Sequence, residues 1–91
     1  MARIVFVNGA FLPFEEARLP IMDRGFLFAD GIYEVSAVIG RRLVDNEGHL
    51  TRLGRSLGAI RIANPYTDEE WIGLQTELIA RNDLDEGIVY T

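Results

Sequence analysis

The sequence predicts an α+β domain in which a mostly antiparallel sheet carries two helices on one face. Short apolar segments with alternating side chains lie near both ends of the chain, and tight-turn dipeptides separate neighbouring segments, which predicts the sheet. Apolar residues between positions 45 and 81 recur at spacings of three and four, which predicts the helices. A chain of 91 residues holds one domain at most.

The earliest expected element is a β-hairpin at the N-terminal end. Its strands, at 4–7 and 10–12, flank Asn8-Gly9, the dipeptide that best adopts the positive φ angles of a two-residue turn. Pro13 and Pro20 lack a backbone donor. We therefore expect residues 15–19 between them to form an edge strand or an extended connection.

A glycine-punctuated acidic stretch, residues 22–31, precedes the next strand. Gly25 and Gly31 permit backbone angles that a Cβ disfavours, and aspartates bond nearby amides, so two sharp turns are expected. The strand expected at 32–39 has alternating faces, and one carries Ile32, Glu34, Ser36 and Val38. The other face is almost wholly apolar, with the phenol of Tyr33 near its start, where it can orient a small ligand.

Two helices are expected after a second hairpin turn at Gly40-Arg41 and a strand at 42–44. Asp45 or Asn46 can cap the first helix, which would run to about Ile62 with its apolar stripe at Leu50, Leu53, Leu57 and Ile60. Asn64-Pro65 ends that helix. Thr67 and Glu70 form a capping-box pattern for a second helix, to about Arg81, whose apolar side carries Trp71, Leu74 and Leu78.

Residues 88–91 are expected to form a strand after a turn at 82–87. A half-buried strand is an unusual place for a domain to end, since termini usually lie in polar, flexible sequence. We therefore expect residues 1–91 to be an incomplete, N-terminal part of a longer protein. The alternative is a short edge strand that completes the fold.

Composition excludes several classes of function. The chain has no cysteine, which excludes a disulfide framework and any thiolate metal site or nucleophile. A net charge of −5 argues against nonspecific nucleic-acid binding, which depends on cationic side chains. All nine basic residues are arginine, and five of them lie at 41–61 against two acids, so this segment can hold a small anion. We found no membrane-span or signal pattern and expect a cytoplasmic protein.

Several ordered motifs give the chain a resemblance to a known family. They are Val7-Asn8-Gly9, the segment DRGFLFADGIYEV at 23–35, His49-Leu50-Thr51-Arg52-Leu53, and Ile62-Ala63-Asn64-Pro65-Tyr66. Together they resemble the amino-terminal domain of the fold-type IV, or class-IV, pyridoxal-phosphate aminotransferases, and most of all the D-amino-acid aminotransferases. Ala29 departs from the pattern, since many members have glycine there, and alanine is tolerable at this position if its φ is negative.

The resemblance implies roles for three residues. Arg52 matches the arginine that binds the phosphate of pyridoxal 5′-phosphate, and a guanidinium suits phosphate because its planar fork is always charged. Tyr33 matches a substrate-side tyrosine of the D-amino-acid enzymes, and Val35 would line the same pocket. No catalytic residue is expected in this chain, because the family's Schiff-base lysine would lie beyond Thr91, so the 91 residues alone should be inactive.

The resemblance also implies amino transfer between a D-amino acid and a 2-oxo acid, in a homodimer. The alternatives left open are a branched-chain aminotransferase, an aminodeoxychorismate lyase, and a non-catalytic dimerisation or binding domain. No metal is expected, since His49 lacks a second ligand at suitable spacing and is interpreted as a capping or packing residue. For Asp23, Asp30 and Glu34 we expect local backbone bonds and pairing with Arg24.

Overall fold

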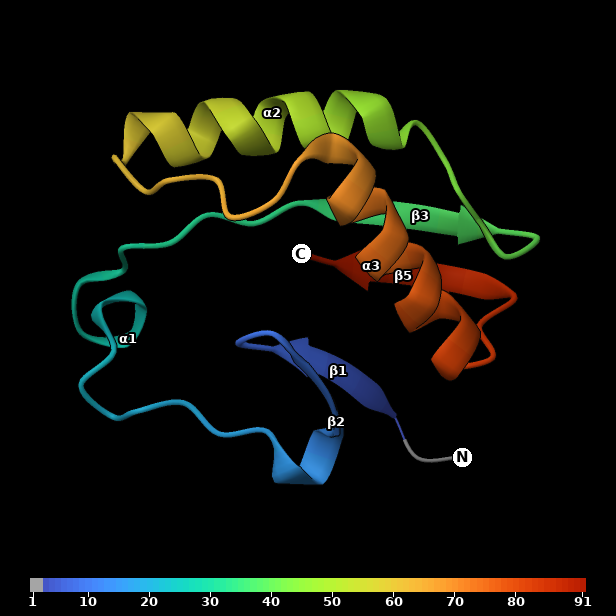
Figure 1. Cartoon of the computed structure of the whole chain (residues 1–91), viewed down its shortest axis with the longest axis horizontal. Coiled ribbons are helices and arrows are strands. Elements are labelled where there is room, and N and C mark those ends of the chain that lie inside the picture. The colour runs from blue at the N-terminus through green and yellow to red at the C-terminus, as the bar shows by residue number, and fades with distance from the viewer. Residues whose placement is uncertain (1–2) are drawn as a thin grey trace.

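The computed structural model describes residues 3–91 and confirms the α+β class. Its strands form two small antiparallel sheets (Figure 1). One is a hairpin of β1 (Ile4–Val7) and β2 (Ala10–Pro13), and the other has the order β4-β3-β5. The three strands of that sheet are β3 (Val35–Ile39), β4 (Arg42–Leu43) and β5 (Glu86–Tyr90).

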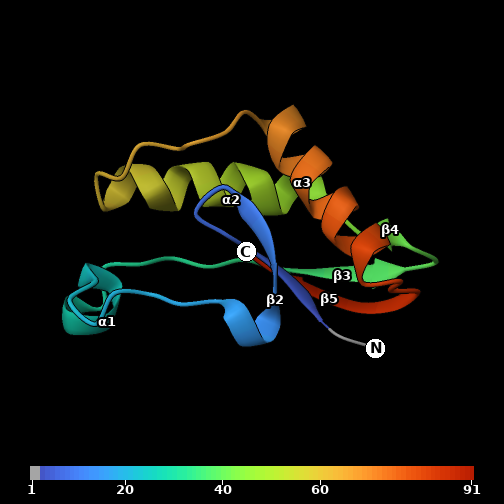
Figure 2. The ribbon, with the colours of Figure 1, turned by 60° about the horizontal axis from the view of Figure 1, so that its bottom comes forward.

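Two helices of 14 residues each, α2 (Asn46–Ala59) and α3 (Asp68–Arg81), lie on the same side of β3 (Figures 1 and 2). Val38 of β3 packs with Ile79 of α3 and Val89 of β5 in one buried cluster. A second cluster is formed by the α2 stripe Leu50, Leu53 and Leu57, with Trp71 of α3 against it. The predicted arrangement of two helices on one face is therefore confirmed for the three-stranded sheet.

Both predicted hairpin turns are confirmed by their backbone angles. Asn8 and Gly9 have φ values of 49° and 86°, and Gly40 and Arg41 have 58° and 64°. Positive φ at both central residues is the property of a type I′ turn, which matches the twist of the strands it joins. These two turns set the registers Val7↔Ala10 and Ile39↔Arg42.

The chain between β2 and β3 agrees with the prediction only in part. No edge strand forms at 15–19: residues 15 and 16 belong to the 3₁₀ helix η1 (Phe14–Glu16), and the predicted alternative, a connection, follows from the extended Ala17. It begins a long excursion that stands apart from α2 and α3 (Figure 1). The acidic stretch contains a short helix, α1 (Arg24–Phe28), which Asp23 caps by accepting a bond from the Gly25 amide. Ala29 ends α1 with a φ of +56°, so the condition of a negative φ is not met: this residue takes the left-handed angles that terminate a helix.

The strand predicted at 32–39 begins only at Val35. Glu34 and Thr91 still exchange two backbone bonds of 2.8 Å, but Ile32 and Tyr33 have no strand opposite them.

The apolar face of this strand and of its neighbour β5 is the exposed one. Tyr33, Ile39, Ile88 and Tyr90 are each at least 60% exposed, whereas Glu34 and Ser36 on the other face are only 5% and 1% exposed.

Both long helices end in the same way, with a non-glycine residue in the left-handed region. In α2 this residue is Arg61, with a φ of 59°, and the Ile62 amide donates back to the Leu57 carbonyl at 2.9 Å. Asp83 does the same after α3, with a φ of 49°. These are Schellman motifs, and they stop α2 at Ala59 rather than at the predicted Ile62.

The two helix starts differ from each other. At α3 the predicted capping box is present, since Thr67 accepts from the Glu70 amide and Glu70 accepts from the Thr67 amide. At α2 neither predicted cap forms, because Asp45 makes no capping bond and the Asn46 side chain turns into the interior. There Asn46 accepts from Ser36 and donates to Gln75, both at 2.8 Å.

The buried polar side chains form one continuous chain of hydrogen bonds. It runs from Ser36 of β3 through Asn46 and Gln75 to the hydroxyl of Thr91, which accepts from Gln75 at 3.0 Å. These bonds join the sheet to both helices, and no buried side-chain polar atom within residues 3–91 is left without a partner. Asn82, after α3, similarly bonds both backbone groups of Ile4 and attaches the hairpin.

We expect Gln75→Ala to lower the free energy of unfolding by about 1 to 3 kcal/mol, because it leaves the buried Asn46 amide without an acceptor. The neighbouring Thr76 is exposed, and Thr76→Ala should change stability by less than about 0.5 kcal/mol. Urea unfolding of the two variants measures both values. Equal effects would show that the hydrogen-bond chain contributes no particular stability.

Candidate functional site

The candidate site is built around the carboxylate of Glu34, for which the sequence had predicted only local backbone bonds and pairing with Arg24. Arg52 donates to it through two nitrogens, Nε to Oε2 at 2.7 Å and Nη2 to Oε1 at 2.9 Å. His49 is a second partner, with Nδ1 at 2.6 Å from Oε1. An ionised carboxylate only accepts hydrogen bonds, so Nδ1 of His49 must donate. The buried acid directly before β3 therefore binds two side chains of α2.

Local structure explains how these residues meet. Side chains three apart on a helix share a face, so His49 and Arg52, both in α2, reach the same partner. Glu34 points toward α2 because it alternates with Tyr33 and Val35 and shares its face with Ser36 and Val38. The backbone of Glu34 is itself fixed by its two bonds to Thr91.

The two cationic partners dominate the electrostatics of Glu34. Hydrogen bonds from Arg52 and then from His49 lower the pKa of the Glu34 carboxyl from 4.5 to about 2, against the opposing effect of its burial. The same ion pair raises the pKa of Arg52. Glu34 is thus a buried anion at neutral pH, paired and hydrogen-bonded as a buried charge must be.

Arg52 keeps much of its hydrogen-bonding capacity. Its side chain is 63% exposed, in contrast to the 5% of Glu34. A guanidinium has five N–H donors, and Glu34 accepts from two of them, so three remain for another acceptor. A planar cation held along one edge, with further donors on its exposed side, fits the oxygens of a phosphate group. The phosphate of a cofactor therefore fits the donors that this chain presents.

Tyr33 and Val35 lie on the opposite face of the strand from the Glu34 carboxylate. The ring of Tyr33 stacks on that of Tyr90, with centroids 5.4 Å apart and planes inclined by 5°, and Tyr90 pairs with Val35 in the sheet. The predicted shared face of Tyr33 and Val35 is therefore present. No direct hydrogen bond joins Tyr33 to Arg52 in the described part of the chain; Glu34, next to Tyr33, provides the connection.

Local backbone bonds and pairing with Arg24 were predicted for three acids, and the prediction was right for two and wrong for Glu34. Asp30 pairs with Arg24 at 2.7 Å, and Asp23 bonds the Gly25 amide at 2.9 Å. Glu34 does neither, because its carboxylate reaches α2. His49 likewise caps nothing and bonds Glu34. The spacing His49-x-x-Arg52 was the available signal, since it predicts that both side chains share one helix face.

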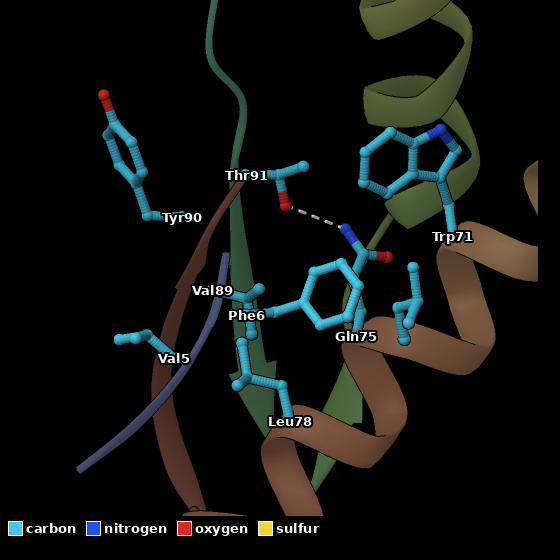
Figure 3. Close-up of a pocket in the computed structure, with 9 residues that line it drawn as sticks. Val5, Phe6, Trp71, Gln75, Leu78, Val89, Tyr90 and Thr91 are labelled. Carbon is cyan, nitrogen blue, oxygen red and sulfur yellow. Dashed lines mark hydrogen bonds between the residues drawn. The ribbon is translucent and has the colours of Figure 1, made fainter. Parts of the chain in front are cut away.

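An apolar cavity of 380 Å³ lies elsewhere, between β1, α3 and β5 (Figure 3). Its walls include Val5, Phe6, Leu78 and Val89, and the bond from Gln75 to Thr91 runs along one side. No charged side chain lines it, and none of Arg52, Glu34 and His49 does so. The cavity therefore suits an apolar group and is separate from the candidate phosphate site.

Comparison with known proteins addresses the predicted resemblance. The chain is 36% identical over 86 residues to a "D-alanine aminotransferase" of Staphylococcus aureus (strain MSSA476), and 37% identical over 86 residues to one of Staphylococcus haemolyticus. A protein of that name from Listeria monocytogenes serotype 4b (strain F2365) is 36% identical. Each match covers 94% of this chain. The predicted resemblance to D-amino-acid aminotransferases is confirmed.

The match covers only part of the length of the D-alanine aminotransferases. The chain spans about 30% of the length of these curated relatives. No family model matches the chain. Within residues 3–91, no helix is long and apolar enough to cross a membrane.

The Glu34 ion pair should make stability depend on pH. A lowered carboxyl pKa stabilises the fold above the ordinary value of 4.5, and this contribution is lost as the pH falls toward 2. The difference in unfolding free energy between the wild type and Glu34→Gln should therefore shrink by on the order of 1 to 3 kcal/mol between about pH 5 and pH 2. Because Arg52 is largely exposed, solvent screening favours the lower end.

Denaturant unfolding at a series of pH values measures this difference. Glu77→Gln is the matched control, because it removes an exposed carboxylate paired with Arg81 at 2.8 Å and should change stability by at most about 0.5 kcal/mol. A wild-type advantage over Glu34→Gln that stays constant down to pH 2 would contradict the assignment.

Proposed function

We propose that this chain is part of a pyridoxal-phosphate-dependent aminotransferase that transfers an amino group from a D-amino acid to a 2-oxo acid. The match to D-alanine aminotransferases over 94% of the chain carries the proposal. In this interpretation the 91 residues supply one side of the site. The proposal extends to a homodimeric protein, and the exposed apolar side chains of β3 and β5 are compatible with a covering partner.

Arg52 is the residue that we assign to the cofactor phosphate. Support comes from its geometry, since the guanidinium is anchored by Glu34 on one edge and has three further N–H donors on its exposed side. Bound pyridoxal phosphate supplies an aldehyde that can accept an amino group and a ring that stabilises negative charge on the substrate. The role of Arg52 is confined to binding and orienting the phosphate.

Tyr33 and Val35 are assigned to the substrate side. They share the exposed face of the sheet, and Tyr33 is held by its stack on Tyr90, which presents a fixed phenol beside an apolar surface. Such a surface can orient a small amino acid through one hydrogen bond while it packs against the side chain.

The amine that anchors the cofactor has to come from outside these residues, since the sequence contains no lysine. We propose that the lysine lies in the part of the protein that the relatives possess and this chain does not span. The full-length protein should then absorb visible light when loaded with pyridoxal phosphate, with borohydride abolishing that absorbance, while the 91 residues alone should be inactive. A colourless full-length protein would refute the proposed function.

Substitution of Arg52 tests the phosphate role. In the full-length protein, Arg52→Gln should weaken the binding of pyridoxal phosphate by about 1.5 to 3 kcal/mol, because a charge-assisted contact is lost. Arg55, one turn further along the same helix and also exposed, provides the matched control in Arg55→Gln. Equilibrium titration of the apoprotein measures both. Equal affinities in the two variants would remove Arg52 from the site.

Substitution of Tyr33 tests the substrate role. Tyr33→Phe keeps the ring that stacks on Tyr90 and removes only the hydroxyl, so stability should hold while turnover with D-alanine falls or its KM rises by roughly tenfold. Steady-state kinetics with D-alanine, L-leucine and aminodeoxychorismate also separates the D-amino-acid enzyme from its branched-chain and lyase relatives. Unchanged kinetics would return Tyr33 to a structural role.

A further inference from the structure

We propose that Glu34 is a positioning residue, whose buried carboxylate fixes the plane of the Arg52 guanidinium so that its remaining N–H donors are presented to the cofactor phosphate. The inference rests on the proposed function of Arg52 and extends it to a residue that does not itself touch the ligand. It follows from the contrast between an immobile carboxylate and an exposed arginine that depends on it.

Glu34 is immobile for three independent reasons. Its side chain is only 5% exposed, its backbone amide and carbonyl both bond Thr91 at 2.8 Å, and its Oε1 is shared between Arg52 and His49. The hydroxyl of Thr91 in turn accepts from the buried Gln75. The carboxylate is therefore fixed to the sheet and, through the buried hydrogen-bond chain, to α3.

Arg52 would be mobile without this partner. Its side chain is 63% exposed, and its only recorded hydrogen bonds among the described residues are the two to Glu34. A long arginine free in solvent samples many rotamers, and binding a phosphate would then require ordering it. The two-point contact through Nε and Nη2 removes that freedom before the ligand arrives.

His49 makes the arrangement more specific than a simple ion pair. With Nδ1 at 2.6 Å from Oε1, it adds a third hydrogen bond to the carboxylate and so opposes rotation of the acid about its last bond. The carboxylate thus has three hydrogen bonds, one on Oε2 and two on Oε1, which define the orientation of its plane. This arrangement matches the general use of outer hydrogen bonds to orient a ligand-binding group.

The experiment compares two ligands that differ only in the phosphate, pyridoxal phosphate and pyridoxal, each titrated into the full-length apoprotein and followed by visible absorbance. Glu34→Gln should lower the affinity for pyridoxal phosphate by about three- to tenfold. The affinity for pyridoxal should stay within about twofold of the wild-type value, because only the phosphate contacts Arg52. In the Arg52→Gln background, Glu34→Gln should have no further effect on the ratio of the two affinities.

Ser36→Ala is the matched control. Ser36 lies two residues along the same buried face, is 1% exposed and bonds Asn46, so its loss perturbs the same region without touching Arg52. It should lower stability and leave the affinity ratio unchanged. If Glu34→Gln does not fold, Glu34→Asp keeps the buried charge but withdraws it by one methylene, and the same selective loss is expected.

The results distinguish the phosphate role of Arg52 from the positioning role of Glu34. If the wild type prefers pyridoxal phosphate and Arg52→Gln reduces that preference, the phosphate role stands and Glu34 is judged alone. Three results would then overturn the positioning role of Glu34. Glu34→Gln could lower the affinities for both ligands equally, it could leave the ratio of the two affinities unchanged, or it could change that ratio as much in the Arg52→Gln background as in the wild type. If Arg52→Gln keeps the preference, the proposed role of Arg52 fails and the role of Glu34 fails with it.

Discussion

The contact on which the candidate site depends is the one between the Glu34 carboxylate and the Arg52 guanidinium. It crosses from the start of β3 to the middle of α2, and it is the point where an exposed cation meets a fully buried anion. A carboxylate in this environment is tolerable only because donors surround it, and Arg52 and His49 are those donors. The ion pair therefore places Arg52 and at the same time allows the sheet to bury an acid.

The same strand divides the domain into two chemically different sides. The side toward α2 and α3 carries Glu34, Ser36 and Val38 and is buried, while the side with Tyr33 and Ile39 is exposed although it is the more apolar one. The polar residues are accommodated by hydrogen bonds that run through Asn46 and Gln75 to Thr91. Tyr33 therefore lies on the face of the strand opposite the one from which Glu34 holds Arg52 of α2.

The sequence predicted the elements whose causes are local. Asn8-Gly9 and Gly40-Arg41 determine their turns, and Thr67 with Glu70 determines the start of α3, because each signal acts over two to four residues. Prediction from the sequence failed where an element or contact depends on residues far apart along the chain. Glu34 meets His49 and Arg52 across separations of 15 and 18 residues, and Asn46 gives up a capping bond to satisfy buried partners. Which face of β3 is buried depends on where the helices pack, so alternation alone could not reveal it.

The central claim concerns the ionisation of one buried acid, and carbon NMR of that side chain tests it most directly. With ¹³C-labelled protein, the Cδ resonance of Glu34 is followed while the pH is lowered. The account predicts a midpoint near pH 2, held there chiefly by the Arg52 hydrogen bonds, and a higher midpoint in Arg52→Gln. A wild-type midpoint close to 4.5 would mean that Glu34 does not hold the guanidinium and would contradict the account.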